Sequence, residues 1–358
     1  MIVKNERSIL RQCLESVKPH IDCWVIVDTG STDGTQELVR EVMEGIPGEL
    51  HERPWVDFAY NRNEALALAK TKATHALFLD ADEQLVCPQK FPPLTQQTYF
   101  ISVREPTADY LRIFLIDLSL PWQWKGLVHE TLVCPEASTS TVLSGMHIRS
   151  DSSLGARSRD PDKYLKDAAL LEKALAQDPT DSRSVFYLAQ SYLNAGKLDR
   201  ALDNYQKRSS MGGWDQEVFW SLYQVGVILE RQHAPFPDII ATYTAAYRYR
   251  PTRAEPLYRL ARYFLIQNNP FLAYTTAKQG LSLPLPPDNV FVERWIYRFG
   301  LLHVLADAAL QLGRLDEFSS VCQTLLAQDD LPDELRTVIL SAAMSVVPTG
   351  RLARATGG

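Results

Sequence analysis

The sequence predicts an α/β domain followed by an all-α domain of helical repeats. Short β-type runs alternate with helical patterns from residue 1 to about residue 95, whereas helical patterns are nearly continuous from Tyr164 onward. With 358 residues and 46% hydrophobic content, the chain is long enough for two domains with cores of their own. We place the α/β domain at residues 1–152, a linker at 153–163, the repeats at 164–347 and a flexible tail at 348–358.

The first elements alternate between strand and helix. The strand "MIV" precedes a helical pattern in "NERSILRQCLESV", for which Asn5 is a candidate N-cap. The strand "WVIVD" precedes the helix "STDGTQELVREVMEG", which Gly45 ends, and "GELHERP", "NRNEALALAK" and "ALFLD" continue the alternation. This order predicts a mostly parallel sheet with helices on its faces, and such sheets bind ligands beyond the carboxyl ends of their strands.

The segments after about residue 95 predict a change of architecture. "TYFISV", "LRIFLID" and "STVLSGMHI" are strand-like and fit antiparallel additions to the sheet. In the helical region, "LAQSYLNAGKLDRAL" (188–202) is matched by "LADAALQLGRLDEFS" (305–319). The matched pair favours four degenerate helix-turn-helix repeats of the tetratricopeptide kind plus a terminal helix, and the alternative is an irregular helical bundle.

Composition excludes several classes of function. The formal net charge of −6 argues against a non-specific nucleic-acid binder. The five cysteines show no CxxC or Cys/His ligand spacing, so they indicate neither a disulfide framework nor a zinc site and favour a reducing, cytoplasmic location. No apolar stretch approaches the ~18 residues of a membrane span.

Acidic residues end two of the predicted strands. In "LFLDADE", Asp80 and Asp82 fall on one side of an extended segment with Ala81 turned away, and two such carboxylates predict a Mg²⁺ or Mn²⁺ site. The alternative is that they cap a turn. In "VIVDTGSTDGT", Asp28 precedes a glycine-containing turn and is a candidate for hydrogen bonds from a nucleobase or ribose. The alternative there is a capped turn, with Ser31 or Thr32 as the N-cap.

Four motifs, "MIVKNE", "VDTGSTDGT", "FAYNRNEAL" and "LFLDADE", occur in this order and resemble the inverting glycosyltransferases of family two with the GT-A fold. Nearly the whole chain is similar to the bacterial branch in which a tetratricopeptide region follows the catalytic domain. The resemblance implies a nucleotide-sugar donor, with UDP as the expected nucleotide, a divalent metal, and transfer with inversion at the anomeric carbon. Thr29 stands where many relatives carry a second acid.

The resemblance also implies roles for individual residues. Asp28 would contact the nucleoside, Arg62 and Asn63 the diphosphate or base, Asp80 the ribose, and Asp82 the metal. The full donor-binding set comprises Val3, Asn5, Glu6, Asp28, Thr29, Gly30, Arg62, Asn63, Asp80 and Ala81, and the metal set comprises Asp82, Asp80 and His147.

A third site follows from the implied reaction. Inverting transfer needs a base on the acceptor side, and Glu130 in "WQWKGLVHETL" is the candidate. Its neighbour His129 is a candidate for metal or phosphate contact, and His147 either completes the metal site or packs. A surface glutamate and a buried, hydrogen-bonded histidine remain the alternatives. Trp122 and Trp124 either stack on a sugar or belong to the core.

The repeats predict the acceptor class. Stacked helix pairs form extended concave surfaces, which suit a peptide, a protein or a glycan chain, or a second copy of the enzyme. No nucleic-acid partner is expected. Two rival functions stay open: a tetratricopeptide scaffold with a vestigial nucleotide-sugar domain, and a hydrolase that transfers the sugar to water.

Overall fold

A computed structural model describes residues 1–105, 109–126, 128–151, 153–155, 160–288 and 290–346. The predicted tail at 348–358 lies outside the described residues, as do residue 347 of the predicted repeats and residues 152 and 156–159 around the predicted linker. The chain divides into two compact units, Met1–Lys207 and Arg208–Gly358, so that α4, α5 and most of α6 belong with the α/β domain. Within the described residues, no helix is long and apolar enough to span a membrane.

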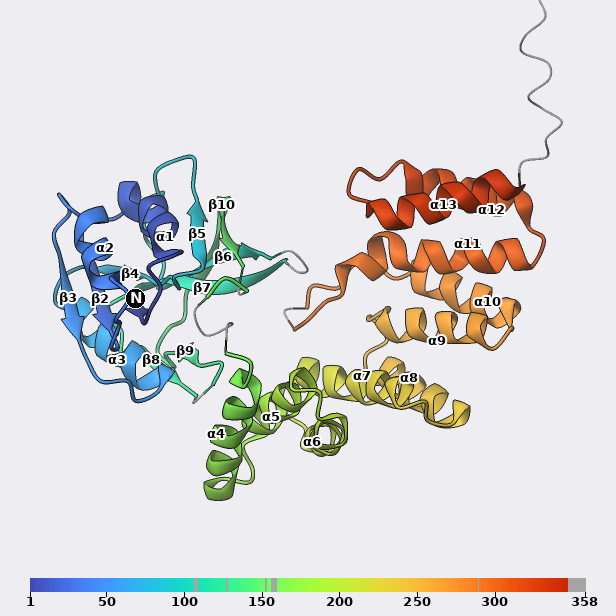
Figure 1. Ribbon diagram of the computed structural model, residues 1–358, viewed down its shortest axis with the longest axis horizontal. Helices are drawn as coiled ribbons and strands as arrows, with labels where there is room; N and C mark the ends of the chain where they lie inside the picture. Colours follow the sequence, from blue (N-terminus) through green and yellow to red (C-terminus); the bar gives the residue numbers. More distant parts are fainter. Residues whose placement is uncertain (106–108, 127, 152, 156–159, 289, 347–358) are drawn as a thin grey trace, which may run out of the picture. The chain divides into compact units, whose positions relative to one another are not determined.

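The α/β domain contains two sheets and a small ribbon (Figure 1). The strands are β1 (Ile2–Val3), β2 (Trp24–Asp28), β3 (Gly48–Glu52), β4 (His75–Leu77), β5 (Glu83–Val86), β6 (Thr98–Arg104), β7 (Asp109–Asp117), β8 (Gln123–Lys125), β9 (Thr131–Val133) and β10 (Ser140–Ser150). The order β1-β2-β3 is parallel, the order β4-β7-β6-β10-β5 is mixed, and β8 pairs with β9. Strand β4 pairs with antiparallel β7 and not with the parallel strands β1, β2 and β3. The sequence did not predict this pairing, because hydrophobic periodicity indicates that a strand exists but not which strand it pairs with.

Helices pack against the sheets of this domain. They are α1 (Leu10–Val17), the 3₁₀ turn η1 (Lys18–His20), α2 (Thr35–Val42) and α3 (Phe58–Ala69). One apolar cluster joins α1 and α2 to the two larger sheets, and a second cluster contains Leu66 of α3, Ile116 of β7 and Trp122. Leu115 of β7 belongs to the first cluster and its neighbour Ile116 to the second, so this strand contributes side chains to both.

Helix starts differ in part from the sequence prediction. Asp57 is the N-cap of α3, where its carboxylate accepts a hydrogen bond from the Tyr60 backbone N–H at 2.7 Å. Asn5 is not the cap of α1: the helix begins at Leu10, and Asn5 has a positive φ of 55°. Neither Ser31 nor Thr32 caps α2, whose N-cap position is Gly34. The side chains of Asn5 and Ser31 instead accept hydrogen bonds from each other's loop, as described below.

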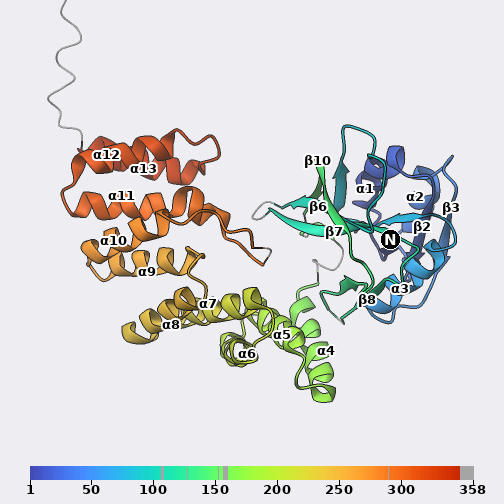
Figure 2. The same ribbon diagram turned by 180° about the vertical axis from the view of Figure 1, so that it is seen from behind.

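The rest of the chain is helical. The helices are α4 (Lys163–Gln177), α5 (Ser182–Asn194), α6 (Leu198–Ser210), α7 (Asp215–Arg231), α8 (Phe236–Tyr249), α9 (Glu255–Ile266), α10 (Pro270–Leu281), the π-helical turn η3 (Ile296–Gly300), α11 (Leu301–Gln311), α12 (Leu315–Leu326) and α13 (Asp333–Val346). In unit 2, α7 packs on α8, α9 on α10 and α11 on α12, and successive pairs stack, with α13 against α12 (Figures 1 and 2).

The same turn joins α5 to α6, which form the first repeat, and joins α7 to α8, α9 to α10 and α11 to α12 in the three repeats that follow. Gly196, His233, Asn268 and Gly313 have φ values of 70°, 54°, 55° and 71°. At each of these turns, the next residue donates its N–H to the carbonyl five positions earlier, which is the Schellman pattern that ends a helix. Four equivalent turns confirm the predicted four helix-turn-helix repeats in the described part of the chain.

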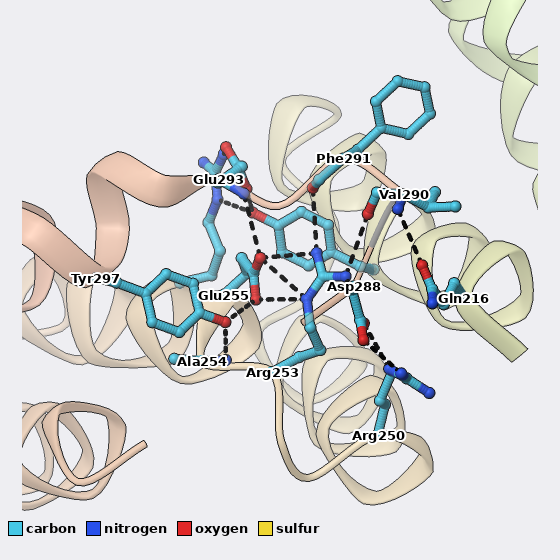
Figure 3. Close-up of polar contacts among 12 residues, drawn as sticks. Gln216, Arg250, Arg253, Ala254, Glu255, Asp288, Val290, Phe291, Glu293 and Tyr297 are labelled. Atoms are coloured by element: carbon cyan, nitrogen blue, oxygen red, sulfur yellow. Dashed lines mark hydrogen bonds and ion pairs between the residues drawn. The ribbon is translucent and has the colours of Figure 1, made fainter. Parts of the chain in front are cut away.

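The connection between α10 and α11 is longer than the others and is held by a buried ion network (Figure 3). Arg253 is fully buried, and its guanidinium donates to Glu255, to Asp288 and to the carbonyls of Val290 and Phe291. Arg250 pairs with the same Asp288 at 2.5 Å. Each buried charge has an opposite partner, so the network fixes this connection against the start of α9.

Candidate active site

Three residues of the predicted site meet at Arg62. Its Nη2 donates to Oδ1 of Asp80 at 2.6 Å, and its Nε donates to Oε1 of Glu130 at 2.5 Å. The side chains of Arg62 and Glu130 are 12% and 10% exposed. The guanidinium carbon of Arg62 also lies 4.9 Å from the ring centroid of Trp124, within the range of a cation–π contact. Helix α3, the end of β4 and the segment before β9 thus converge on one cation.

The charges in this group set one another's ionisation. Burial acts to lower the pKa of Arg62, but the charges of Asp80 and Glu130 outweigh it and raise that pKa, so Arg62 is always charged. Burial acts to raise the pKa of Asp80, and the charges of Arg62 and Arg112 outweigh it and lower that pKa. Asp80 is therefore a carboxylate at neutral pH.

Asp82 has the opposite electrostatics. Burial, and then repulsion from Asp80, raise the pKa of Asp82 to about 6. A Cβ atom on Gly155 would lie 3.4 Å from Oδ2 of Asp82, so the chain after β10 passes close to this carboxylate. The local excess of negative charge is of the kind that a bound cation relieves.

The predicted metal ligands do not form a three-residue centre. His147 lies in β10, where it pairs with Val86 of β5 and Ser102 of β6. Among the residues that the structure describes, no group of three His, Cys, Asp or Glu side chains could hold a metal ion. Asp80 and Asp82 nevertheless fit Mg²⁺ or Mn²⁺, because Mg²⁺ is commonly bound by one or two carboxylates while substrate phosphates and water supply the remaining ligands.

A second layer of charged residues, which was not predicted from the sequence, lies beneath Asp80. Glu83 is 2% exposed, and its carboxylate accepts from Nη2 of Arg112 at 2.6 and 2.8 Å and from the backbone N–H of Asp80 at 2.9 Å. The thiol of Cys13 donates to the carbonyl of Asp80 at 3.2 Å. Burial raises the pKa of Glu83. An arginine inside the apolar strand "DYLRIFLID" was the signal for this pair, since such a charge needs a partner.

Asp28 is buried at the end of β2. Its Oδ1 accepts from the N–H groups of Gly30 and Ser31 at 2.8 and 2.7 Å, which stabilises the turn, whereas its Oδ2 has no hydrogen-bond partner in the described part of the chain. Thr29 donates its N–H and its hydroxyl to the carbonyl of Val3. A buried carboxylate oxygen without a partner requires an explanation, and a donor group of a ligand is the simplest one.

The first loop of the chain holds this turn from the other side. The side-chain oxygen of Asn5 accepts from the N–H of Thr32 at 2.8 Å, and the N–H of Asn5 donates to the Ser31 hydroxyl at 2.9 Å. The N–H of Glu6 donates to the Thr35 hydroxyl at 3.0 Å. These contacts explain why Asn5 and Ser31 are not helix caps: their side chains tie two loops together.

Two further predicted donor residues have structural contacts. The Asn63 side chain donates to the carbonyl of Trp124 at 2.9 Å and accepts from its N–H at 2.8 Å. Ala81 is buried in the main apolar cluster, as expected for a residue turned away from the site. Trp122 belongs to the core, with its indole N–H bonded to the carbonyl of Asp117 at 2.9 Å.

His129 contacts helix α5. Its ring stacks on that of Tyr187 in α5, with centroids 4.2 Å apart and planes 16° apart. Its carbonyl accepts from Nη2 of Arg183 at 3.4 Å. The backbone of His129 has a positive φ of 54°, so the chain changes direction immediately before Glu130.

Comparison with known proteins agrees with this fold. Residues 1–95 match the model of glycosyl transferase family 2, and residues 170–203 match a tetratricopeptide repeat model. The chain is 36% identical over 86 residues to the lipopolysaccharide core biosynthesis glycosyltransferase LpsC of Rhizobium meliloti, a match that covers 24% of this chain and 31% of that protein. It is 39% identical over 87 residues to a TPR repeat-containing protein of Synechococcus elongatus, which covers 24% of this chain and 20% of that protein. The chain thus spans between a fifth and a third of the length of these curated relatives.

A solved tetratricopeptide protein, TTC0263 of Thermus thermophilus, covers 51% of this chain and 91% of its own, at 23% identity and a TM-score of 0.37. Residues 1–95 of the α/β domain are thus similar to the glycosyltransferases of family 2, and residues 170–203 of the helical region that follows are similar to a tetratricopeptide repeat.

Proposed function

We propose that the protein is a metal-dependent inverting glycosyltransferase that moves a sugar from a nucleotide-diphosphate donor, with UDP as the expected nucleotide. The observation that carries the proposal is the convergence of Arg62, Asp80 and Glu130 inside the domain that matches family 2. A cytoplasmic location remains a prediction from the cysteine pattern.

The donor would bind along the ends of β2 and β4. Oδ2 of Asp28 is the acceptor for a hydrogen bond from the nucleoside, since it has no partner in the described residues. Asp82 and Asp80 would hold Mg²⁺ or Mn²⁺, and Arg62 places a permanent positive charge beside Asp80 for the diphosphate. When bound, the cation would neutralise charge that develops on the leaving diphosphate.

In the transfer step, the acceptor hydroxyl attacks the anomeric carbon from the face opposite the diphosphate. The new bond joins the acceptor oxygen to that carbon, the bond from the carbon to the diphosphate oxygen breaks, and the electron pair leaves with the nucleoside diphosphate. The proton goes to Glu130, whose Oε1 is bonded to Arg62 and whose Oε2 would receive it. The roles of His129 and His147 in phosphate or metal binding remain predictions.

The helical repeats would present the acceptor, which we expect to be a peptide, a protein or a glycan chain, or would bind a second copy of the enzyme. The match of residues 170–203 to a tetratricopeptide repeat supports this part of the proposal.

The test measures thermal stabilisation and sugar release by a panel of nucleotide sugars with and without Mn²⁺. The wild type should be stabilised by one donor only when metal is present, because a ligand that binds the folded state raises its stability. Asp82→Asn should lose the metal-dependent part of the shift and at least 100-fold of the transfer rate, whereas Glu15→Gln on the exposed face of α1 should lose neither.

The rival functions predict different results. A scaffold would show no metal-dependent shift with any donor, and that outcome would refute the enzymatic proposal. A hydrolase would release free sugar at full rate without an acceptor.

A further inference from the structure

Helix α5 of the first repeat contacts the segment that carries Glu130. The ring of Tyr187 stacks on His129, and Nη2 of Arg183 donates both to the carbonyl of His129 and, at 3.2 Å, to the Tyr187 hydroxyl. The guanidinium of Arg183 also lies 5.0 Å from the centroid of the Tyr187 ring. All of these residues belong to the same compact unit.

His129 has a backbone conformation that its surroundings must stabilise. A non-glycine residue with positive φ costs roughly 1–2 kcal/mol and persists where its surroundings determine it. The ring of His129 is held by stacking and its carbonyl by Arg183, so both halves of the residue are tied to α5. The next residue is Glu130, which therefore leaves the α5 contact in a defined direction.

The helix is itself fixed at its start. Asp181 is the N-cap of α5, and its carboxylate accepts from the N–H groups of Arg183 and Ser184 at 3.1 and 3.2 Å. Arg183 thus sits in the first turn of a capped helix. Glu130 is held from two sides, by Arg62 through its carboxylate and by α5 through the preceding residue.

We infer that Arg183 and Tyr187 are positioning residues that set the place of Glu130, so that the first helical repeat is part of the active-site framework and not only a surface for acceptors. The inference rests on the proposed role of Glu130. It also means that a ligand bound to α5 could change the position of Glu130 through one intervening residue, His129.

The test compares Tyr187→Leu with Tyr187→Phe. Leucine removes the stacked ring, and we expect kcat to fall by about 10- to 100-fold with the donor KM unchanged within twofold, since small displacements of a catalytic group carry costs of this order. Phenylalanine keeps the ring and should recover most of the rate that leucine loses. Arg183→Lys, which keeps the charge but not the planar fork, should lower kcat to an intermediate value.

The matched control is Tyr164→Leu on α4. Tyr164 is also a partly exposed tyrosine beside a cation, with Nζ of Lys163 at 5.2 Å from its ring, and it does not take part in the His129 contacts. We expect its kcat to equal that of the wild type. Equal losses in Tyr164→Leu and Tyr187→Leu would assign the effect to the helices in general and overturn the inference.

Hydrogen exchange separates this inference from the proposed function. Tyr187→Leu should raise amide exchange in residues 124–133 at least fivefold and leave residues 24–28 of β2 unchanged, whether or not the protein transfers sugar. If the wild type shows no sugar transfer, the proposed function is refuted, but hydrogen exchange still tests whether α5 holds the segment that carries Glu130. Unchanged exchange in residues 124–133 would overturn the inference.

Discussion

Replacing Arg62 with methionine should destabilise the α/β domain by about 3 kcal/mol. The substitution keeps a long apolar stem but removes the cation that Asp80 and Glu130 share. Removing one partner of a buried ion pair costs about 3–5 kcal/mol because a charge is left without compensation. The Glu130 side chain is only 10% exposed and would lose its partner inside the protein. We use the lower end of this range because the Asp80 side chain is 32% exposed, so water can partly solvate its charge.

The assay is urea unfolding followed by far-UV circular dichroism and tryptophan fluorescence, with Arg11→Met as the matched control. Arg11 pairs with Glu41 at 2.7 Å, close to the distances at Arg62, but its side chain is 45% exposed. Exposed pairs contribute little, so Arg11→Met should leave the unfolding midpoint within experimental error. Equal midpoints for the two variants would refute the claim that burial makes the Arg62 contacts strong.

Two more predictions concern the helical repeats. His233→Gly should stabilise the protein by up to about 1 kcal/mol and Gly313→Ala should destabilise it by about 1 kcal/mol, because both positions have positive φ. No atom lies within 4 Å of a Cβ on Gly313, so the backbone conformation alone should set the effect of alanine there. Thermal melts check the sign of both changes, and a neutral Gly313→Ala would contradict the turn assignment. Hydrogen bonds from Arg250 and Arg253 outweigh burial and lower the pKa of Asp288 below its usual 3.8, so its stabilising effect is complete above pH 4 and disappears as the pH falls through the lowered value. The difference in unfolding free energy between the wild type and Asp288→Asn should therefore shrink below pH 4, and a constant difference down to pH 2 would contradict this.

The repeats were predictable from the sequence because their turns are local. A glycine at 196 and at 313, each between matched helical patterns, marks the left-handed residue that ends the first helix of a pair. His233 and Asn268 occupy the same position without the glycine signal. Helical periodicity around them, and not the turn residue itself, allowed the other two pairs to be recognised.

The partners of strands and polar side chains were much less predictable. The run "ALFLD" shows that a strand exists, but its antiparallel pairing with β7 depends on residues 38 to 42 positions away, as in His75 with Asp117 and Leu77 with Leu115. Asn5 and Ser31 are residue types that often cap helices, yet the side chain of each forms a hydrogen bond with the loop of the other. Short polar side chains accept any nearby N–H, so local patterns cannot decide between a cap and a contact across 26 residues.

The same limit explains the form of the candidate site. Arg62, Asp80 and Glu130 were predicted separately, for the diphosphate or nucleobase, for the ribose, and as the catalytic base. In the structure Arg62 donates hydrogen bonds to both carboxylates. A guanidinium has donors on several nitrogens, so one arginine can hold two carboxylates from distant segments while a lysine of the same charge has no fixed fork to do so. Arg62 therefore couples the geometry of the proposed donor site to that of the proposed base. Movement of either carboxylate on ligand binding must be accompanied by a response of the other, because the cation between them is buried.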